Sequence, residues 1–416
     1  MRWSPQQEIA LRRVAEFMAD PSRQVFYLAG YAGTGKTTLA KVFSEGVEGL
    51  VLFGAFTGKA AYVLRQKGCE GATTLHSLIY ISQQQSKAKL RELEERLAAT
   101  LLDLEDEQAD NDDFDAEDDP VVRNIRAALA EENKNLSRPF FALNPDSPLR
   151  DANLLVVDEV SMVDQQMGED LISFGIKILV LGDPGQLPPV FGAGYFTSRE
   201  PDFLLTEIHR QAADNPILHL ATRVRLGQSI SLGTYGESRI IRQDQLDIAD
   251  VLACDQMLVG RNETRRDSNV KLRKLQLPKD EPYNVYPLPG DRVVCLRNNH
   301  ELGLLNGAIW NVISAGKPID DCIGLNIEPE GGGERQYVTS HTHYFEKRGD
   351  KLAWYDKASA QEFDYGYALT VHKSQGSQWN NVLLFDESMA FREYRNKWLY
   401  TGLTRAAEKI TLVRMS

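Results

Sequence analysis

The chain has 416 residues, of which 42% are hydrophobic and 25% are charged, and its formal net charge is −12. This composition is typical of a globular protein with roughly two to four domains. No run approaches about 18 uninterrupted apolar residues, so no membrane span or membrane partner is expected. The N-terminus lacks the apolar core of a signal peptide, which favours the cytoplasm. The four cysteines are scattered, so neither a disulfide framework nor a zinc site is expected.

The acidic excess is local. Residues 101–120 contain eleven acidic residues and no basic one, so the rest of the chain is close to neutral. A near-neutral body can still carry a basic groove along one face. The net charge therefore does not exclude a nucleic-acid partner.

The first segment predicts a helix followed by a phosphate-binding loop. Ser4 and Pro5 are typical of an N-cap and of the first helical position. The apolar run 25–29 then precedes the sequence Gly-Tyr-Ala-Gly-Thr-Gly-Lys-Thr at 30–37. A strand, a glycine-rich turn and a helix in this order form a P-loop, whose backbone N–H groups surround phosphate oxygens. We therefore expect the chain to bind and hydrolyse a nucleoside triphosphate together with Mg²⁺.

Each P-loop residue has an expected role. Lys36 would reach the β- and γ-phosphates, and the Thr37 hydroxyl would ligate Mg²⁺. Gln7 has two interpretations, which the sequence leaves open: it closes a capping box with Ser4, or its amide reads the adenine edge. The other residues expected to hold the nucleotide are Gly33, Thr34, Gly35 and Thr38.

Strands and helices alternate through the first part of the chain, which implies a parallel sheet with helices on both faces. Residues 80–135 interrupt this pattern with leucines at helical spacing and then the acidic run. We predict an inserted helical hairpin with a solvated acidic tip. Two interpretations of the acidic run 103–119 stay open: a disordered loop tip, or a DNA mimic that covers the groove.

Two later strands lead into polar residues, at the position where open α/β sheets bind ligands. The buried strand 154–157 ends in Asp158 and Glu159, and the strand 176–181 leads to Gln186. Asp158 is expected to hold Mg²⁺ and its waters, and Glu159 to orient and deprotonate the attacking water. Gln186 is a candidate to bond the γ-phosphate or that water.

Three polar clusters are candidates for contacts with a nucleic-acid backbone, because hydroxyl, imidazole and lysine groups bond phosphate oxygens without reading sequence. Their members are Thr57, Gly58 and Lys59; Thr74, His76 and Ser77; and Thr370, His372 and Lys373. Arg210 and Arg405 are candidates for a γ-phosphate contact from across a cleft. From their spacing alone, surface salt bridges are the better explanation for both arginines.

Taken in chain order, these motifs closely resemble those of superfamily 1 helicases, specifically the RecD-like/Dda branch, superfamily 1B. Residues 290–307, within a region of short alternating runs, look like the β-barrel inserted in that family. The matching segments are WSPQQ (3–7), GYAGTGKTT (30–38), FTGKAA (56–61), TTLHS (73–77), VVDEVSM (156–162), GDPGQLPPV (182–190), IHRQ (208–211), YALTVHKSQGS (367–377) and LYTGLTRA (399–406).

The resemblance implies an α/β fold of two RecA-like P-loop motor domains with parallel sheets, with ATP between them and single-stranded DNA across their tops. It also implies that Arg210 and Arg405 contact the γ-phosphate and that Gln186 couples hydrolysis to DNA. The implied domains are 1–79 plus 136–200 (motor domain 1A), 80–135 (helical and acidic insert 1B), 201–280 plus 355–416 (motor domain 2A) and 281–354 (β-barrel insert 2B).

The activity implied by the resemblance is that of a monomeric ATP-dependent helicase or translocase. It would move 5′→3′ on single-stranded and tailed duplex DNA, in replication, repair or recombination. The 80–135 insert is longer and more acidic than the compact strand-separating pin of the family. Two alternatives stay open. One is a single-strand translocase with little unwinding activity; the other is a nucleotide-gated DNA-binding subunit of a repair or nuclease complex, with a protein partner on the insert.

Overall fold

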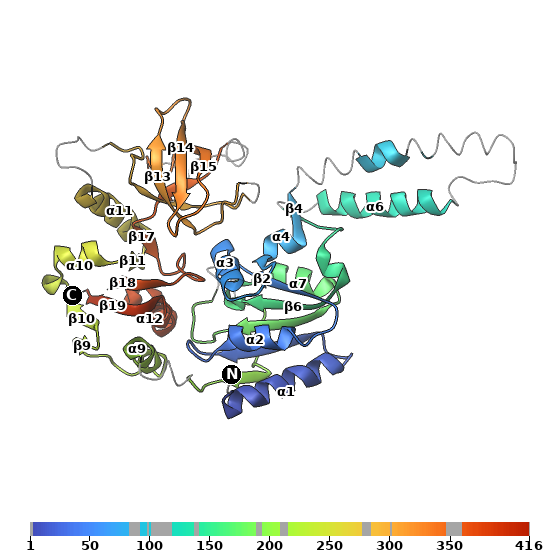
Figure 1. The fold of residues 1–416 in the computed structure, drawn as a ribbon, viewed down its shortest axis with the longest axis horizontal. Coiled ribbons are helices and arrows are strands. Elements are labelled where there is room, and N and C mark those ends of the chain that lie inside the picture. Colours follow the sequence, from blue (N-terminus) through green and yellow to red (C-terminus); the bar gives the residue numbers. More distant parts are fainter. Residues whose placement is uncertain are drawn as a thin grey trace, which may run out of the picture.

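The computed structural model describes residues 3–82, 92–97, 100, 119–136, 141–188, 194–208, 215–276, 284–299, 302–346 and 360–415. These residues form two α/β lobes side by side, a small antiparallel barrel above the second lobe, and an arm that projects from the first (Figure 1). We call the lobe that carries the N-terminal sheet lobe 1 and the lobe that carries the C-terminal sheet lobe 2.

Lobe 1 is built on six strands that all run parallel, in the order β3-β2-β6-β7-β1-β8. Apolar clusters cover both faces of this sheet, which explains why its central strands are nearly continuous apolar runs. The strands are β1 Val25–Gly30, β2 Leu50–Ala55, β3 Thr73–Thr74, β6 Ala152–Asp158, β7 Lys177–Gly182 and β8 Phe203–Leu205. The helices are α1 Pro5–Ala19, α2 Lys36–Ser44, α3 Gly58–Gln66, α4 Leu75–Ile79 and α7 Gln165–Ser173, with 3₁₀ turns η2 Pro148–Asp151 and η3 Val160–Met162.

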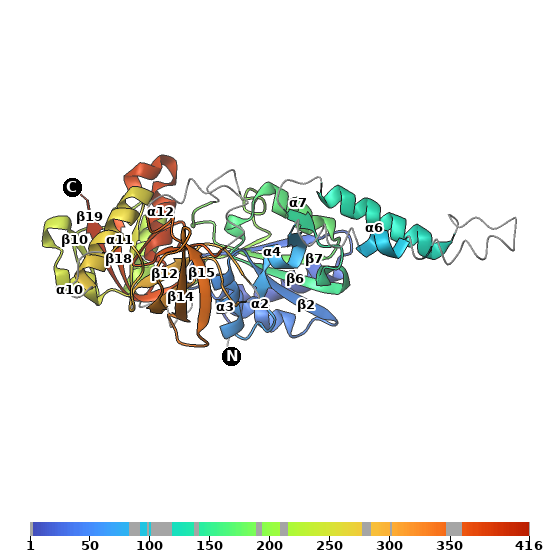
Figure 2. The ribbon, with the colours of Figure 1, turned by 90° about the horizontal axis from the view of Figure 1, so that it is seen from above.

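The arm leaves lobe 1 through a two-stranded antiparallel sheet of β4 Tyr80–Ser82 and β5 Phe141–Leu143. Its helix α6, Pro120–Leu136, points away from both lobes in two perpendicular views (Figures 1 and 2). Asp119 begins this helix, because its Oδ1 accepts the N–H of Val121 at 2.7 Å. The rest of the acidic run 103–119 lies outside the described residues, so both interpretations of its role stay predictions.

Lobe 2 has the strand order β17-β11-β18-β19-β10-β9, in which only β10 and β9 pair antiparallel. The strands are β9 Gly233–Tyr235, β10 Ser238–Arg242, β11 Gln256–Val259, β17 Ala368–Thr370, β18 Trp379–Asp386 and β19 Ala406–Arg414. The helices are α9 Pro216–Arg225, α10 Ile248–Ala253, α11 Asn262–Gln276 and α12 Arg395–Leu403, with 3₁₀ segments η4 Gln243–Gln245 and η7 Ser388–Tyr394.

The predicted β-barrel is present as an antiparallel sheet in the order β15-β14-β13-β12-β16. A bridge between Ser340 and Gln361 joins its two edges and closes the sheet. β16 pairs with β12 although it lies beyond residue 354, where the sequence places the end of the insert. The strands are β12 Arg292–Cys295, β13 Ile309–Ala315, β14 Cys322–Pro329, β15 Gln336–His341 and β16 Phe363–Tyr365.

A buried ion pair ties the barrel to lobe 2. Arg273 of α11 is 0% exposed and donates through Nε to both carboxylate oxygens of Asp291, at 2.8 and 3.0 Å. Asp291 also accepts the Tyr367 hydroxyl at 2.7 Å and the N–H of Leu288 at 2.7 Å. A buried carboxylate with four such bonds is well compensated, but it becomes costly when its cation is removed.

We therefore expect Arg273→Ala to destabilise the folded chain by about 3–5 kcal/mol, because it leaves Asp291 buried without its cation. The measurement is the shift in the denaturant midpoint of unfolding. Lys271→Ala, at an exposed position of the same helix, is the matched control and should leave the midpoint within about 0.5 kcal/mol of the native value. Equal midpoints for the two variants would contradict this prediction.

Candidate active site

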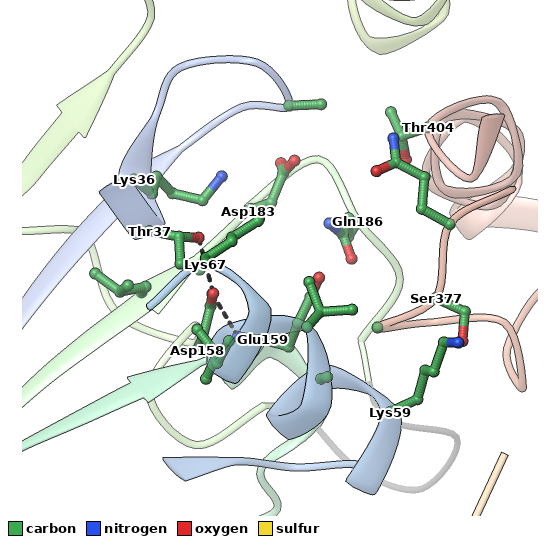
Figure 3. A pocket seen from close by; sticks show the side chains of 18 of the residues that line it. Lys36, Thr37, Lys59, Lys67, Asp158, Glu159, Asp183, Gln186, Ser377 and Thr404 are labelled. Atoms are coloured by element: carbon green, nitrogen blue, oxygen red, sulfur yellow. Dashed lines mark hydrogen bonds between the residues drawn. The ribbon is translucent and has the colours of Figure 1, made fainter. Parts of the chain in front are cut away.

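A cavity of about 550 Å³ lies between the two lobes, and residues from both lobes line it (Figure 3). Lobe 1 contributes the P-loop, the end of β6 and the loop that follows β7, because the carboxyl ends of parallel strands meet at one edge of the sheet. Lobe 2 contributes the segment 376–378 together with Thr404 and Arg405. Of the residues predicted for the nucleotide, Gly33, Gly35, Lys36, Thr37 and Thr38 line this cavity.

The P-loop has the backbone shape that phosphate binding requires. Gly33 and Gly35 have φ of 78° and 81°, in the left-handed region that favours glycine. A Cβ on Gly30 would lie 2.6 Å from the Thr34 hydroxyl, so the loop can fold this tightly only with glycine there. Lys36 Nζ donates to the carbonyl of Gly30 at 2.6 Å and to that of Tyr31 at 3.2 Å, which holds the ammonium group over the loop.

Thr37 and Asp158 form the pair of oxygens that a Mg²⁺ site needs. The Thr37 hydroxyl donates to Asp158 Oδ2 at 2.9 Å, and the backbone N–H of Glu159 donates to Asp158 Oδ1 at 2.8 Å (Figure 3). Hydroxyl and carboxylate oxygens are ligands that Mg²⁺ accepts beside a nucleotide. The residues present therefore fit the predicted metal.

Glu159 sits in the cavity wall beside Asp158. Its backbone is left-handed, with φ of 53°, an uncommon conformation for a residue other than glycine. Burial raises the pKa of its carboxyl group, the charge of Arg405 opposes this, and the charge of Asp158 raises the pKa further. A carboxyl group with a raised pKa is a stronger base than an exposed glutamate, which suits proton abstraction from water.

The structure places Arg405 in the wall of the nucleotide cavity instead of on the surface. Its side chain is 6% exposed, and the guanidinium donates to the carbonyls of Thr401 at 3.1 Å and Ser377 at 3.2 Å. These contacts within lobe 2 fix the cation at the seam between the lobes. Arg210 belongs to residues 209–214, which lie outside the described residues, so its role stays a prediction.

Gln7 closes the capping box and also supports the P-loop. Its Oε1 accepts the N–H of Ser4 at 3.0 Å, and the N–H of Gln7 donates to the Ser4 hydroxyl at 3.3 Å. Its Nε2 donates to the carbonyl of Thr34 at 3.1 Å. Both ends of the amide are thus engaged within the chain, so an adenine contact would have to replace one of these bonds.

Gln186 lines the cavity at the end of a tight turn in which its N–H donates to the carbonyl of Asp183 at 3.1 Å. The side chain is only 7% exposed, and its Oε1 has no hydrogen-bond partner among the described residues. A buried amide oxygen without a partner is costly, so a donor from a ligand or a water would stabilise it.

The three clusters predicted to contact DNA lie at the carboxyl ends of β2, β3 and β17. In each cluster a threonine shapes the turn: Thr57 accepts the N–H of Ala60, Thr74 that of Ser77, and Thr370 that of Lys373, at 3.2, 3.2 and 3.3 Å. These bonds fix the backbone of each turn at the edge of its sheet. Each of the three hydroxyl oxygens therefore already accepts one hydrogen bond within the chain. Contact with DNA stays a prediction for all three clusters.

The remaining members of these clusters have different surroundings. Lys59 lines the nucleotide cavity, and Gly58 is covered by Leu305 of the barrel, whose Cβ would lie 2.5 Å from an added Cβ. Burial lowers the pKa of His76 and of His372. Both imidazoles therefore stay neutral at pH 7 and would contact a phosphate through an N–H group and not through charge.

Two residues of lobe 2 that the sequence does not single out contact the P-loop directly. The Tyr400 hydroxyl accepts the N–H of Ala32 at 2.9 Å and donates to Asp183 Oδ2 at 2.7 Å. The Arg225 guanidinium lies 3.6 Å from the ring centre of Tyr31. Tyr400 could have been noticed because it lies inside the motif at 399–406. A single aromatic residue at such a position is, however, equally typical of a residue of the hydrophobic core.

The fold and this cavity define a two-lobed P-loop protein with a nucleotide site at the seam. The family described as an AAA domain matches residues 2–245, more than half of the chain, and the UvrD-like helicase C-terminal domain matches residues 365–413. The chain therefore belongs to this AAA domain family and carries a UvrD-like helicase C-terminal domain. Both matches confirm the resemblance to helicases.

Two of the relatives are a DNA helicase and a conjugal transfer protein. The chain is 27% identical over 285 residues to the ATP-dependent RecD2 DNA helicase of Deinococcus radiodurans, covering 62% of this chain and 36% of that protein. It is 23% identical over 448 residues to the conjugal transfer protein TraA of Rhizobium radiobacter, covering 99% of this chain and 32% of that protein. The chain thus spans about a third of the length of each of these relatives.

Solved structures share the fold along the whole chain. A Pif1 helicase from Bacteroides, in complex with ADP-AlF3 and single-stranded DNA, aligns with a TM-score of 0.52 at 16% identity, covering 99% of this chain and 92% of that one. Pif1 from Candida albicans aligns with a TM-score of 0.51 at 17% identity, covering 99% and 94%. The predicted α/β class with two RecA-like domains is confirmed.

The predictions from the sequence about membrane spans and about clusters of metal ligands can be compared with the described part of the chain. No helix there is long and apolar enough to cross a bilayer. No group of three or more histidine, cysteine, aspartate or glutamate residues within it is arranged to hold a metal ion. The Mg²⁺ inferred here would instead be shared between Thr37, Asp158 and the nucleotide phosphates.

We expect Lys36→Ala to lower ATP hydrolysis at least about a hundredfold, because it removes the ammonium group that the phosphate loop holds by its own carbonyls. The measurement is the rate of phosphate release at saturating ATP. Lys41→Ala on the same helix removes an ammonium that pairs with Glu45 at 3.8 Å outside the cavity, and it should keep the native rate. Near-native turnover by Lys36→Ala would contradict the site assignment.

We expect Arg405→Ala to retain ATP binding and to lose about 10³-fold or more in hydrolysis, because the cation acts on charge that develops in the transition state. Binding is measured with a fluorescent ATP analogue and hydrolysis by phosphate release. Arg405→Lys keeps the charge but loses the planar guanidinium that can donate two parallel hydrogen bonds. Its hydrolysis rate should therefore lie between those of the native chain and of Arg405→Ala. Equal loss of binding and hydrolysis in Arg405→Ala would instead show a structural role.

Proposed function

We propose that the chain is an ATP-dependent DNA helicase or translocase that moves 5′→3′ on single-stranded DNA. One observation carries this proposal: Lys36 and Asp158 of lobe 1 and Arg405 of lobe 2 line the same cavity. A triphosphate held by both lobes makes the distance between the lobes depend on the state of the nucleotide. That dependence is what a motor on DNA requires.

In this proposal the chain contributes four actions to hydrolysis. Lys36 neutralises the phosphate oxygens, and Thr37 with Asp158 holds Mg²⁺, which neutralises phosphate charge when bound. Glu159 orients the attacking water and accepts its proton, because burial raises the pKa of its carboxyl group. Arg405 offsets the negative charge on the γ-phosphoryl group as it passes from ADP, the leaving group, to the attacking water, and it can do so only when lobe 2 lies against lobe 1.

The strand of DNA would lie along the edge formed by the ends of β2, β3 and β17, which spans both lobes. The groups there that suit phosphate contacts without base reading are Thr57, His76, His372 and Lys373. Lys59 belongs to the same segment as Thr57, but it also lines the nucleotide cavity. Alternate tightening of the lobe 1 and lobe 2 contacts during an ATP cycle would then advance the strand. The domain boundaries given by the resemblance, a monomeric state and a protein partner on the 80–135 insert remain part of this proposal.

A single-strand translocase with little unwinding activity is the second candidate. The observation that favours it is the arm: α6 projects away from both lobes, whereas a strand-separating pin has to reach the duplex junction (Figure 1). The nucleotide-gated subunit of a larger complex is a third candidate, since each curated relative named above is much longer than this chain.

We expect single-stranded DNA to stimulate ATP hydrolysis by the isolated chain at least about tenfold, because DNA favours the closed arrangement of the lobes. The first measurement is phosphate release with and without an unstructured oligonucleotide. Unwinding is then followed on duplexes with a 5′ tail, with a 3′ tail and with blunt ends. Unwinding of the 5′-tailed duplex alone is the expected result.

The other outcomes separate the candidates. Stimulation by DNA without unwinding of any duplex would favour the translocase, and unwinding of the 3′-tailed duplex alone would contradict the proposed polarity. Tight DNA binding without stimulation would contradict the motor and favour the nucleotide-gated subunit.

A further inference from the structure

The loop that follows β7 leaves lobe 1 and packs against lobe 2 at Leu187, and the next strand, β8, lies again in lobe 1. Leu187 is 1% exposed and belongs to the apolar cluster of lobe 2, with Val371, Trp398 and Leu403 among its members. The chain therefore leaves the parallel sheet of lobe 1 at Gly182 and buries a side chain in the other lobe only five positions later. We call residues 183–187 the bridging loop.

Lobe 2 holds the far end of the bridging loop by both backbone polar groups of one residue, Leu187. The N–H of Leu187 donates to Thr401 Oγ1 at 3.0 Å, and the carbonyl of Leu187 accepts Gln375 Nε2 at 3.1 Å. The Thr401 hydroxyl donates its own proton to the carbonyl of Lys397 at 2.7 Å, so its oxygen faces Leu187 as an acceptor. Thr401 and Gln375 are both buried, so water does not replace these bonds.

The near end of the bridging loop is also bound to lobe 2. Asp183 accepts the Tyr400 hydroxyl through Oδ2 at 2.7 Å and the N–H of Gly185 through Oδ1 at 2.9 Å. Gln186 lies between these two anchored ends, with its amide oxygen buried at the cavity and without a partner among the described residues. Its position is thus set by α12 and by the turn that contains Gln375.

Gln375 connects this arrangement to the edge proposed for DNA. It lies in the turn that follows β17, where its N–H donates to the carbonyl of His372 at 3.3 Å and that of Ser374 donates to the carbonyl of Thr370 at 3.0 Å. Thr370 and His372 are two of the residues that the sequence predicts to contact DNA. A shift of this turn on DNA binding would move Gln375, the peptide of Leu187 and then Gln186.

We propose that the bridging loop is carried by lobe 2, and that Thr401 and Gln375 are positioning residues that hold Gln186 at the terminal phosphate. The inference rests on the proposed function and deepens it, because it names the contacts through which DNA accelerates hydrolysis. Gln186 then follows lobe 2 while Lys36 and Asp158 stay with lobe 1, so the site is complete only when the lobes approach.

The test compares Thr401→Val with Thr401→Ser. Valine has the shape of threonine but no acceptor for the N–H of Leu187, whereas serine keeps the hydroxyl. We expect Thr401→Val to lower the kcat of DNA-stimulated hydrolysis about tenfold, which corresponds to about 1.4 kcal/mol. The KM for ATP should change by less than about twofold, since Thr401 does not touch the nucleotide. Thr401→Ser should restore most of the native kcat.

A second variant makes the test independent of any folding defect in the first. Gln375→Leu removes the donor to the carbonyl of Leu187 and should give the same loss of kcat with an unchanged KM. Thermal unfolding midpoints are recorded for all three variants. Native kcat in both Thr401→Val and Gln375→Leu would overturn the inference, as would a Thr401→Ser variant as impaired as Thr401→Val. DNA-stimulated hydrolysis by the native chain is the control that separates this inference from the proposed function. If DNA does not stimulate the native chain, the proposed function is wrong; if it does, the variants test the inference alone.

Discussion

The contact between the P-loop and α12 is the interaction on which the site depends. The Tyr400 hydroxyl lies between an N–H of the P-loop and the carboxylate of Asp183, and it is buried. Burial raises the pKa of Tyr400, and the charge of Asp183 raises it further, so the hydroxyl keeps its proton and can donate and accept at once. The Tyr400 hydroxyl therefore connects lobe 2 both to the P-loop and to the loop that carries Gln186.

The sequence predicts those parts of the site whose chemistry is local. The P-loop needs glycine at Gly33 and Gly35 for its backbone, and the strand before Asp158 is apolar because both sheet faces are covered. Such constraints leave patterns within a few residues of one another. The capping box of Gln7 is also local, and the sequence shows it as one of two alternatives. The structure adds that the same amide supports the P-loop at Thr34.

The contacts between the lobes could not be predicted in the same way, because they join residues far apart in the chain. Leu187 follows Gln186 in a loop, and nothing in the adjacent sequence shows that its side chain is buried in the core of the other lobe. Arg405 is ambiguous for a related reason: an arginine at that spacing fits a surface ion pair, whereas its bonds to the carbonyls of Thr401 and Ser377 fix it in the cavity wall. The pairing of β16 with β12 likewise spans a long segment.

The barrel shares an apolar core with lobe 2, yet Leu305 at one of its turns rests on Gly58, the first residue of α3 in lobe 1. The barrel is therefore packed into one lobe and in contact with the other. If the lobes move relative to each other as proposed, this contact has to change with them. Because Gly58 presents no side chain, its backbone can lie this close to Leu305, and any larger residue at position 58 would push the barrel away from lobe 1.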